Sequence, residues 1–75
     1  MPDPRLYMRV LAVLRDRIRD GTYPPGSRLP PFDVMAHEQD VGRDTVQHAY
    51  QLAEHEGHAA RYPGLGYYVA DNPQG

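Results

Sequence analysis

The feature that most constrains this fold is the short turn at Val41-Gly42, which separates two segments that both have helical apolar spacing. Before the turn, the prolines at 30–31 suit a helix entry, and three apolar residues between 32 and 36 supply an inner face. After it, Gly42 can cap a second helix. The apolar side chains of that helix, at i, i+3, i+4 and i+7, are Val46, Ala49, Tyr50 and Ala53. Two helices joined by so tight a turn predict a helix-turn-helix unit.

A longer amphipathic helix is expected ahead of this unit. Asp3-Pro4 suits its start, because Asp can cap the backbone and Pro fits the first turn. Its apolar residues recur every four positions, at Leu6, Val10, Leu14 and Ile18. Gly21 is expected to end the helix in a left-handed conformation, and a proline-containing loop at 21–27 follows.

The end of the chain predicts a β-hairpin. Two short β-prone runs, 59–62 and 67–70, flank a Pro-Gly-Leu-Gly turn at 63–66. The expected class is therefore α+β, a three-helix winged helix-turn-helix with a C-terminal hairpin wing. We expect this domain to cover residues 1–70 and a polar tail to cover 71–75. No effector domain is expected in the chain.

Composition narrows the alternatives. There is no cysteine, so neither a disulfide nor a thiolate metal site is possible. The longest apolar run, 10–14, is too short for a membrane span, and residues 1–4 lack a secretory signal pattern, so a soluble cytoplasmic protein is expected.

The charge distribution argues against a nucleic-acid partner. The net charge is −2, and all eight basic residues are arginine. Residues 1–27 hold five Arg against three Asp, a net charge of +2. Residues 28–69 hold three Arg against six acids, a net charge of −3, although DNA-binding proteins usually carry a basic footprint there.

Several stretches nevertheless resemble one family closely. They are 18–30 (Ile-Arg-Asp-Gly-Thr-Tyr-Pro-Pro-Gly-Ser-Arg-Leu-Pro), 41–46 (Val-Gly-Arg-Asp-Thr-Val), 56–57 (Glu-Gly) and 63–69 (Pro-Gly-Leu-Gly-Tyr-Tyr-Val). Together they resemble the DNA-binding domain of the GntR family of bacterial transcription regulators. The resemblance implies a winged helix that binds double-stranded operator DNA, usually as a homodimer on a two-fold symmetric site. Family members normally carry a C-terminal effector-binding domain, so this chain is expected to be either an isolated N-terminal domain or a stand-alone protein, with no small-molecule effector site of its own.

The sequence departs from the family pattern in places. Asp33 stands where the family usually has a phosphate-binding Arg, and Pro31 stands where it has Ser. In the wing, Leu65 replaces a frequent Arg. Gly42, beside Arg43, replaces the family's Ser. Gln47, after Thr-Val, replaces its Arg, and His58, after Glu-Gly, replaces its Leu. These changes bear on affinity and operator identity rather than on the fold.

The predicted reading residues lie at the start of the third helix. Arg43 is within reach of a guanine edge or a phosphate, and the alternative is a surface arginine paired with a neighbouring aspartate. Thr45 and Gln47 are expected to be the next exposed positions, where Thr can donate to phosphate and Gln can pair with adenine. His48 could also reach the groove.

Four further residues flank this helix. Arg28 and Arg61 are expected to bind phosphate, which adds salt-dependent affinity without sequence preference. Gly64 and Gly66 would let the wing backbone approach DNA closely, although a turn that requires positive φ also explains them.

Other functions are less well supported by the sequence. The four histidines, His37, His48, His55 and His58, do not form a metal site by spacing alone, so neither a metal nor another cofactor is expected. No arrangement of catalytic residues is present, so the chain is not expected to be an enzyme. The alternative left open is a winged-helix module that binds proteins or a second copy of itself and has lost DNA affinity.

Overall fold

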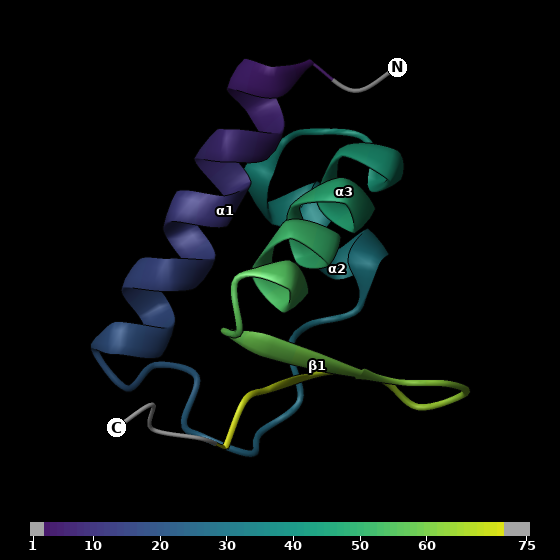
Figure 1. The fold of residues 1–75 in the computed structure, drawn as a ribbon. Coiled ribbons are helices and arrows are strands. Elements are labelled where there is room, and N and C mark those ends of the chain that lie inside the picture. Colours follow the sequence, from purple (N-terminus) through teal and green to yellow (C-terminus); the bar gives the residue numbers. More distant parts are fainter. Residues whose placement is uncertain (1–2, 72–75) are drawn as a thin grey trace.

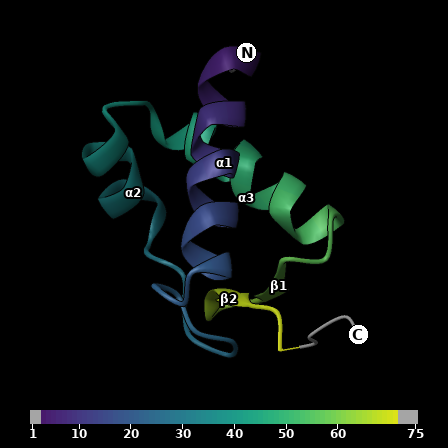
Figure 2. The ribbon, with the colours of Figure 1, turned by 90° about the vertical axis from the view of Figure 1, so that its left-hand side faces the viewer.

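The computed structural model describes residues 3–71. Along them follow the helices α1 (Pro4–Arg19), α2 (Phe32–Gln39) and α3 (Arg43–His55), then the strands β1 (Ala59–Tyr62) and β2 (Gly66–Val69). Figure 1 shows α1 beside α2 and α3, with the hairpin of β1 and β2 below them and extending to one side. The turned view in Figure 2 places α2 and α3 on either side of α1. The predicted α+β winged helix-turn-helix is confirmed, whereas the expected tail falls, apart from Asp71, outside the described residues.

Helix α1 begins and ends as the sequence predicts. The Asp3 carboxylate accepts a hydrogen bond from the Arg5 backbone N–H at 2.9 Å, and Pro4 occupies the first turn, where no N–H is needed. Gly21 follows the last turn with φ +88°, a conformation that favours glycine. The fully buried side chains of α1 are Val10, Leu11 and Leu14. These side chains anchor α1 against α3 in the core.

The turn between α2 and α3 is tight because two caps share it. Asp40 ends α2 in the left-handed region with φ +57°, and Val41 N–H donates to the Ala36 carbonyl oxygen at 3.0 Å. Gly42 is the N-cap of α3 in an extended conformation, as predicted. This turn fixes the direction in which the leading end of α3 emerges.

The wing is an antiparallel pair in which Ala59 lies opposite Val69 and Tyr62 lies opposite Gly66. A third segment that the sequence did not predict extends this ladder. Ser27 O accepts from Val69 N–H at 2.8 Å, and Leu29 N–H donates to Tyr67 O at 2.9 Å. The loop before α2 therefore lies along β2, and the base of the wing is held by hydrogen bonds on both sides.

An aromatic cluster joins the wing to the helices. Tyr50 of α3 lies edge-on to Phe32 and to Tyr67, with ring centroids 5.3 Å apart in both pairs. The Tyr50 hydroxyl donates to the Pro30 carbonyl oxygen at 2.7 Å, which satisfies its only polar atom inside the core. Burial raises the pKa of Tyr50, so the phenol stays neutral at physiological pH. This cluster sets the position of the wing relative to α3.

Within residues 3–71, no helix combines the length and the apolar content that crossing a membrane requires.

Candidate nucleic-acid interface

One face of α3 lies open beside the wing. Its exposed side chains follow at i, i+4, i+8 and i+11, a spacing that places them on the same side of a helix. They are Arg43, Gln47, Gln51 and Glu54. Three of them line a hollow of about 540 Å³ together with Arg61 and Tyr67 of the wing. The hollow is lined by the amides of Gln47 and Gln51 and by two opposite charges, the Glu54 carboxylate and the Arg61 guanidinium.

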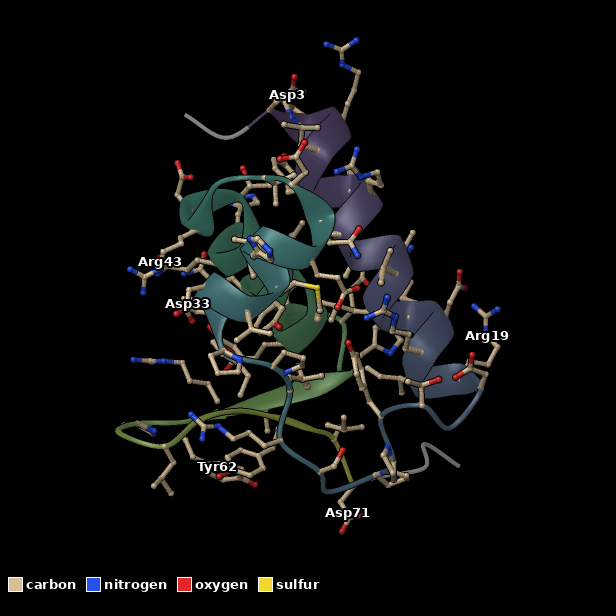
Figure 3. All side chains as sticks on the ribbon, turned by 180° about the vertical axis from the view of Figure 1, so that it is seen from behind. Asp3, Arg19, Asp33, Arg43, Tyr62 and Asp71 are labelled. Carbon is tan, nitrogen blue, oxygen red and sulfur yellow. The ribbon has the colours of Figure 1, made fainter. Side chains whose placement is uncertain are left out.

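Arg43 is the first residue of α3 and is exposed. Figure 3 shows its side chain extending away from the body, on the opposite side of the molecule from Arg19. The alternative of an arginine paired with Asp40 or Asp44 does not occur, because no ion pair among the described residues includes Arg43. Its five donors are therefore available to an external acceptor.

The leading end of α3 is capped from inside the helix. Gly42 supplies no side-chain cap, and instead Asp44 Oδ1 accepts from Thr45 N–H at 3.0 Å. A Cβ at position 42 would lie only 2.9 Å from that oxygen, so glycine leaves the room that this arrangement needs. The family's Ser at position 42 could not be restored without moving the Asp44 carboxylate.

The structure places two of the predicted reading residues against the body of the protein. Thr45 was expected to be exposed, and this is wrong, because its side chain packs inward and the residue is only 5% exposed. His48 is half-buried and packs against Tyr7 of α1, with ring centroids 4.1 Å apart. Gln47, by contrast, is exposed in the hollow as predicted. Which of these residues contact DNA stays a prediction.

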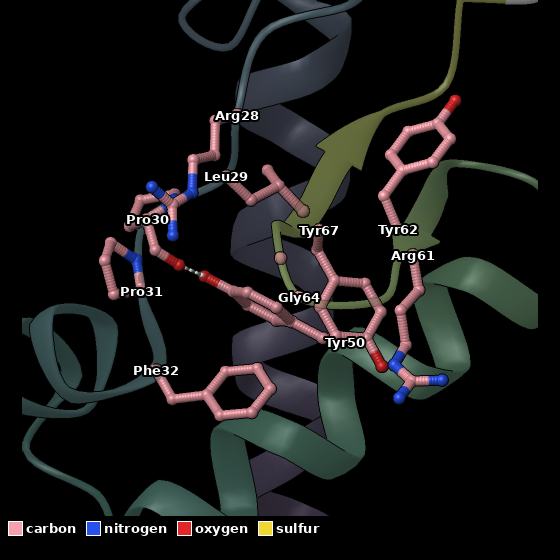
Figure 4. Close-up of a pocket in the computed structure, with 11 residues that line it drawn as sticks. Arg28, Leu29, Pro30, Pro31, Phe32, Tyr50, Arg61, Tyr62, Gly64 and Tyr67 are labelled. Carbon is pink, nitrogen blue, oxygen red and sulfur yellow. Dashed lines mark hydrogen bonds between the residues drawn. The ribbon is translucent and has the colours of Figure 1, made fainter.

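A second hollow, of about 280 Å³, brings the other four predicted residues together. Arg28, Arg61, Gly64 and Gly66 all line it, with an aromatic floor that includes Tyr67 (Figure 4). Burial raises the pKa of Tyr67, so this ring contributes no charge near neutral pH. Arg28 and Arg61 therefore stand on two sides of a neutral aromatic surface.

Arg28 lies directly across the wing backbone. A Cβ at position 66 would lie 3.3 Å from Arg28 Nε and 3.4 Å from Nη2, closer than most real contacts of that kind. Gly66 also has φ +114°, which other residues rarely adopt. The positive φ agrees with the explanation that the turn needs glycine at position 66, whereas the approach of DNA to the wing backbone stays a prediction.

Ion pairs to α1 offset part of the negative charge of residues 28–69, which had argued against a nucleic-acid partner. Glu56 forms a bidentate pair with Arg15, with both carboxylate oxygens 2.8 Å from Nη2. Glu38 is bonded to Arg17, and that contact lowers the pKa of Glu38. Two of the six acids in 28–69 are thus neutralised by α1. The acids left on this part of the chain are Asp33, Asp40, Asp44 and Glu54.

The sequence reasoning missed Gln51 and Glu54 as parts of this face. Helical spacing counted from Arg43 would have identified both, because they follow it by two and three turns. The histidines do not gather, and the described residues contain no group of three His, Asp or Glu side chains placed to hold a metal.

Comparison with known proteins identifies the family to which this chain is similar. Residues 6–69 match the sequence model of a family described as "Bacterial regulatory proteins, gntR family". Over 91% of its length the chain is 41% identical to the Uxu operon transcriptional regulator of Escherichia coli, and over 85% it is 39% identical to the HTH-type transcriptional regulator YdcR of the same organism. These alignments span only 26% and 14% of those two proteins.

The three-dimensional fold is also similar to that of known regulators. A crystal structure titled as a putative transcriptional regulator GntR from Rhodococcus sp. RHA1 superposes with a TM-score of 0.78 and is 38% identical. The alignment covers 85% of this chain and 30% of that one. The likeness therefore covers less than a third of the Rhodococcus chain.

Proposed function

The chain belongs to the gntR family of bacterial regulatory proteins. We propose that it binds operator DNA as a transcription regulator and that it reads this DNA with the leading end of α3. In this proposal α3 enters the major groove, where Arg43 pairs with guanine or an adjoining phosphate and Gln47 pairs with adenine. The observation that carries it is the exposed, unpaired Arg43 at the first turn of a helix flanked by the wing.

The neighbouring cations position the domain. Arg28 and Arg61 lie beside the wing and supply phosphate contacts, while Gly64 and Gly66 keep its backbone free of side chains. Thr45 and His48 take smaller parts, because one is buried and the other is packed on α1. The reading surface therefore centres on Arg43 and Gln47.

Assembly and location belong to the same proposal. The domain lies within residues 1–70 and binds as a homodimer on a two-fold symmetric operator, because half-sites in successive turns of the groove raise affinity for paired domains. It acts in the bacterial cytoplasm, where the operator DNA is. Effector recognition is assigned to no residue of this chain.

The test begins with selection of duplexes from a random library by the 75-residue chain. Gel shifts on a selected duplex then compare the wild type with Arg43→Ala, at low and at moderate salt. Loss of one bidentate guanine contact is worth about 1–3 kcal/mol, so sequence-specific affinity is expected to fall by roughly 5- to 150-fold. Arg19→Ala is the matched control, since it removes the same charge from the opposite side of the molecule. Equal affinity of wild type and Arg43→Ala on every selected duplex overturns the proposal.

A further inference from the structure

The smaller of the two hollows concentrates positive charge on a chain whose net charge is negative. Arg28 and Arg61 line this hollow of about 280 Å³, and none of the described residues that line it is acidic. Neither arginine takes part in an ion pair found among residues 3–71. The larger hollow beside α3 differs, because Glu54 lines it together with Arg61. In the smaller hollow, a small anion therefore meets two cations and no lining carboxylate.

The floor of the smaller hollow is aromatic and is held in place by its own contacts. The ring of Tyr50 lies edge-on to those of Phe32 and Tyr67, and the ring centroids of Phe32 and Tyr67 are 5.9 Å apart. Figure 4 shows the rings of Tyr50 and Tyr67 between the side chains of Arg28 and Arg61. Because each ring packs against the other two, the floor is formed before any ligand binds.

Apart from the two guanidinium groups, the lining offers few hydrogen-bond partners. The Tyr50 hydroxyl donates to the Pro30 carbonyl oxygen at 2.7 Å, and Leu29 N–H donates to the Tyr67 carbonyl oxygen at 2.9 Å. Pro30 and Pro31 have no N–H. Hydroxyl groups of a ligand would lie on this floor without partners, whereas a flat apolar body gains by burial. The lining therefore favours an acid group attached to an apolar ring over a sugar.

The size of the hollow suits one such ring. A protein cavity of about 150 Å³ holds benzene, so about 280 Å³ leaves room for a benzene ring with one or two small substituents. Arginine binds a carboxylate through two parallel hydrogen bonds and also stacks on aromatic faces. An aromatic acid therefore matches both the cations and the floor.

We propose that the smaller hollow binds a small aromatic carboxylate, and that this ligand competes with the DNA backbone for Arg28 and Arg61. The ligand site goes beyond the proposed function, which assigns effector recognition to no residue of the chain. The competition rests on the proposed function, because it needs these arginines to contact phosphate. Binding of the ligand would then release the domain from DNA without any change of fold.

The first test needs no DNA. Benzoate has the ring and the charge, benzamide has nearly the same shape without the charge, and acetate has the charge without the ring. In backbone amide NMR titrations of the 75-residue chain, benzoate is expected to cause saturable shifts around 28–32 and 61–67, with a Kd of about 1 mM for so small a ligand. Benzamide and acetate are expected to bind roughly tenfold more weakly or less, since each lacks one of the two matching features.

Variants locate the ligand on the hollow. Arg28→Ala combined with Arg61→Ala is expected to weaken benzoate binding by about tenfold or more, because each arginine can bind the carboxylate. Arg5→Ala with Arg19→Ala is the control, since both are exposed residues of α1 and their loss removes the same charge. The control is expected to bind benzoate as the wild type does.

The second test measures the competition. Benzoate at ten times its Kd is expected to weaken binding to a selected duplex by about tenfold beyond the effect of sodium acetate at the same ionic strength, because added salt alone also weakens DNA binding. Equal binding of benzoate and acetate in the NMR titrations overturns the proposal, since the arginines would then bind any anion. Benzoate bound at the hollow without loss of DNA affinity beyond the acetate control overturns the competition. Failure of the wild type to bind any duplex would instead remove the proposed function, while the titrations without DNA still decide the ligand site.

Discussion

The arginines on two sides of this molecule differ in whether they form ion pairs. On the α1 side, Arg15 and Arg17 hold Glu56 and Glu38 and so tie the first helix to the helix-turn-helix unit. On the side of α3 and the wing, Arg28, Arg43 and Arg61 take part in none of the ion pairs found among residues 3–71. The net charge of residues 28–69 is therefore a poor guide to the surface formed by α3 and the wing, because Glu38 and Glu56 are paired with arginines of α1.

The comparison implies that arginines on the two sides can be removed with opposite consequences. Substitutions on the α1 side are expected to change stability and leave DNA binding intact. Substitutions near α3 and the wing are expected to change binding and leave stability intact. The following predictions test that separation, beginning with the largest effect.

The largest effect is expected from Arg28→Ala combined with Arg61→Ala. Each phosphate contact contributes a slope of about −0.9 in log affinity against log salt, so the double variant is expected to reduce the slope by nearly two and to bind all duplexes roughly 30-fold more weakly at low salt. Titrations at several salt concentrations measure both. The control is Arg5→Ala with Arg19→Ala, two exposed α1 residues that remove the same charge. An equal loss in the control would mean that only net charge matters.

A gain of affinity is expected from Asp33→Arg. Asp33 is exposed in the first turn of α2, where the family usually has a phosphate-binding arginine. One added contact is expected to raise affinity by about tenfold at low salt and to steepen the salt dependence by about one. The same titration with Asp16→Arg, an exposed position on α1, shows whether location matters. Similar gains from both variants would contradict a localised DNA surface.

A smaller effect, on stability alone, is expected from Arg17→Ala. Arg17 donates to the Glu38 carboxylate and, at 2.7 Å, to the Tyr23 hydroxyl, and these two hydrogen bonds, first the one to Glu38, raise the pKa of Arg17. Loss of this partly exposed network is expected to cost about 1 kcal/mol, which lowers Tm by roughly 4–8 °C in a domain of this size. Thermal unfolding measures it, and affinity per folded molecule should stay unchanged. A large loss of affinity without a change of Tm would place Arg17 in the DNA surface instead.

The smallest expected effect is the pH dependence of the stability difference between the wild type and Arg17→Ala. The Arg17 contact lowers the pKa of Glu38, so Glu38 stabilises the folded state above its unfolded pKa, and this contribution is lost as the pH falls through its folded pKa. The stability difference between wild type and Arg17→Ala is therefore expected to be full near pH 7 and to shrink below about pH 4.5. Urea unfolding at several pH values checks this. A difference that grows on acidification would show that the pair does not act through the Glu38 carboxylate.

The helices and the hairpin could be predicted because their signals are local. Apolar spacing sets the helices, and glycine or proline marks most of their ends, as at Gly21 and Gly42, although Asp40 ends α2. The burial of Thr45 could not be predicted in the same way. Its residue type suggests exposure, but it lies one turn before Ala49, on the side of α3 that faces the core.

The other features that could not be predicted are contacts between residues far apart in the sequence. The packing of His48 on Tyr7 and the pairing of the 26–29 loop with β2 join residues about 40 positions apart, which no periodicity records. The same holds for the Arg15–Glu56 pair. The candidate site is affected most, because which arginines are free depends on where their acids lie.

The measurement that tests the central claim most directly is a backbone amide NMR titration of the chain with a selected duplex. The claim is that the leading end of α3 and the wing form the DNA surface. Chemical-shift changes are expected to be largest from Gly42 to Gln47 and from Arg61 to Tyr67, and small along the exposed face of α1 around Met8. Changes concentrated on α1, with 42–47 unaffected by saturating DNA, would contradict the claim.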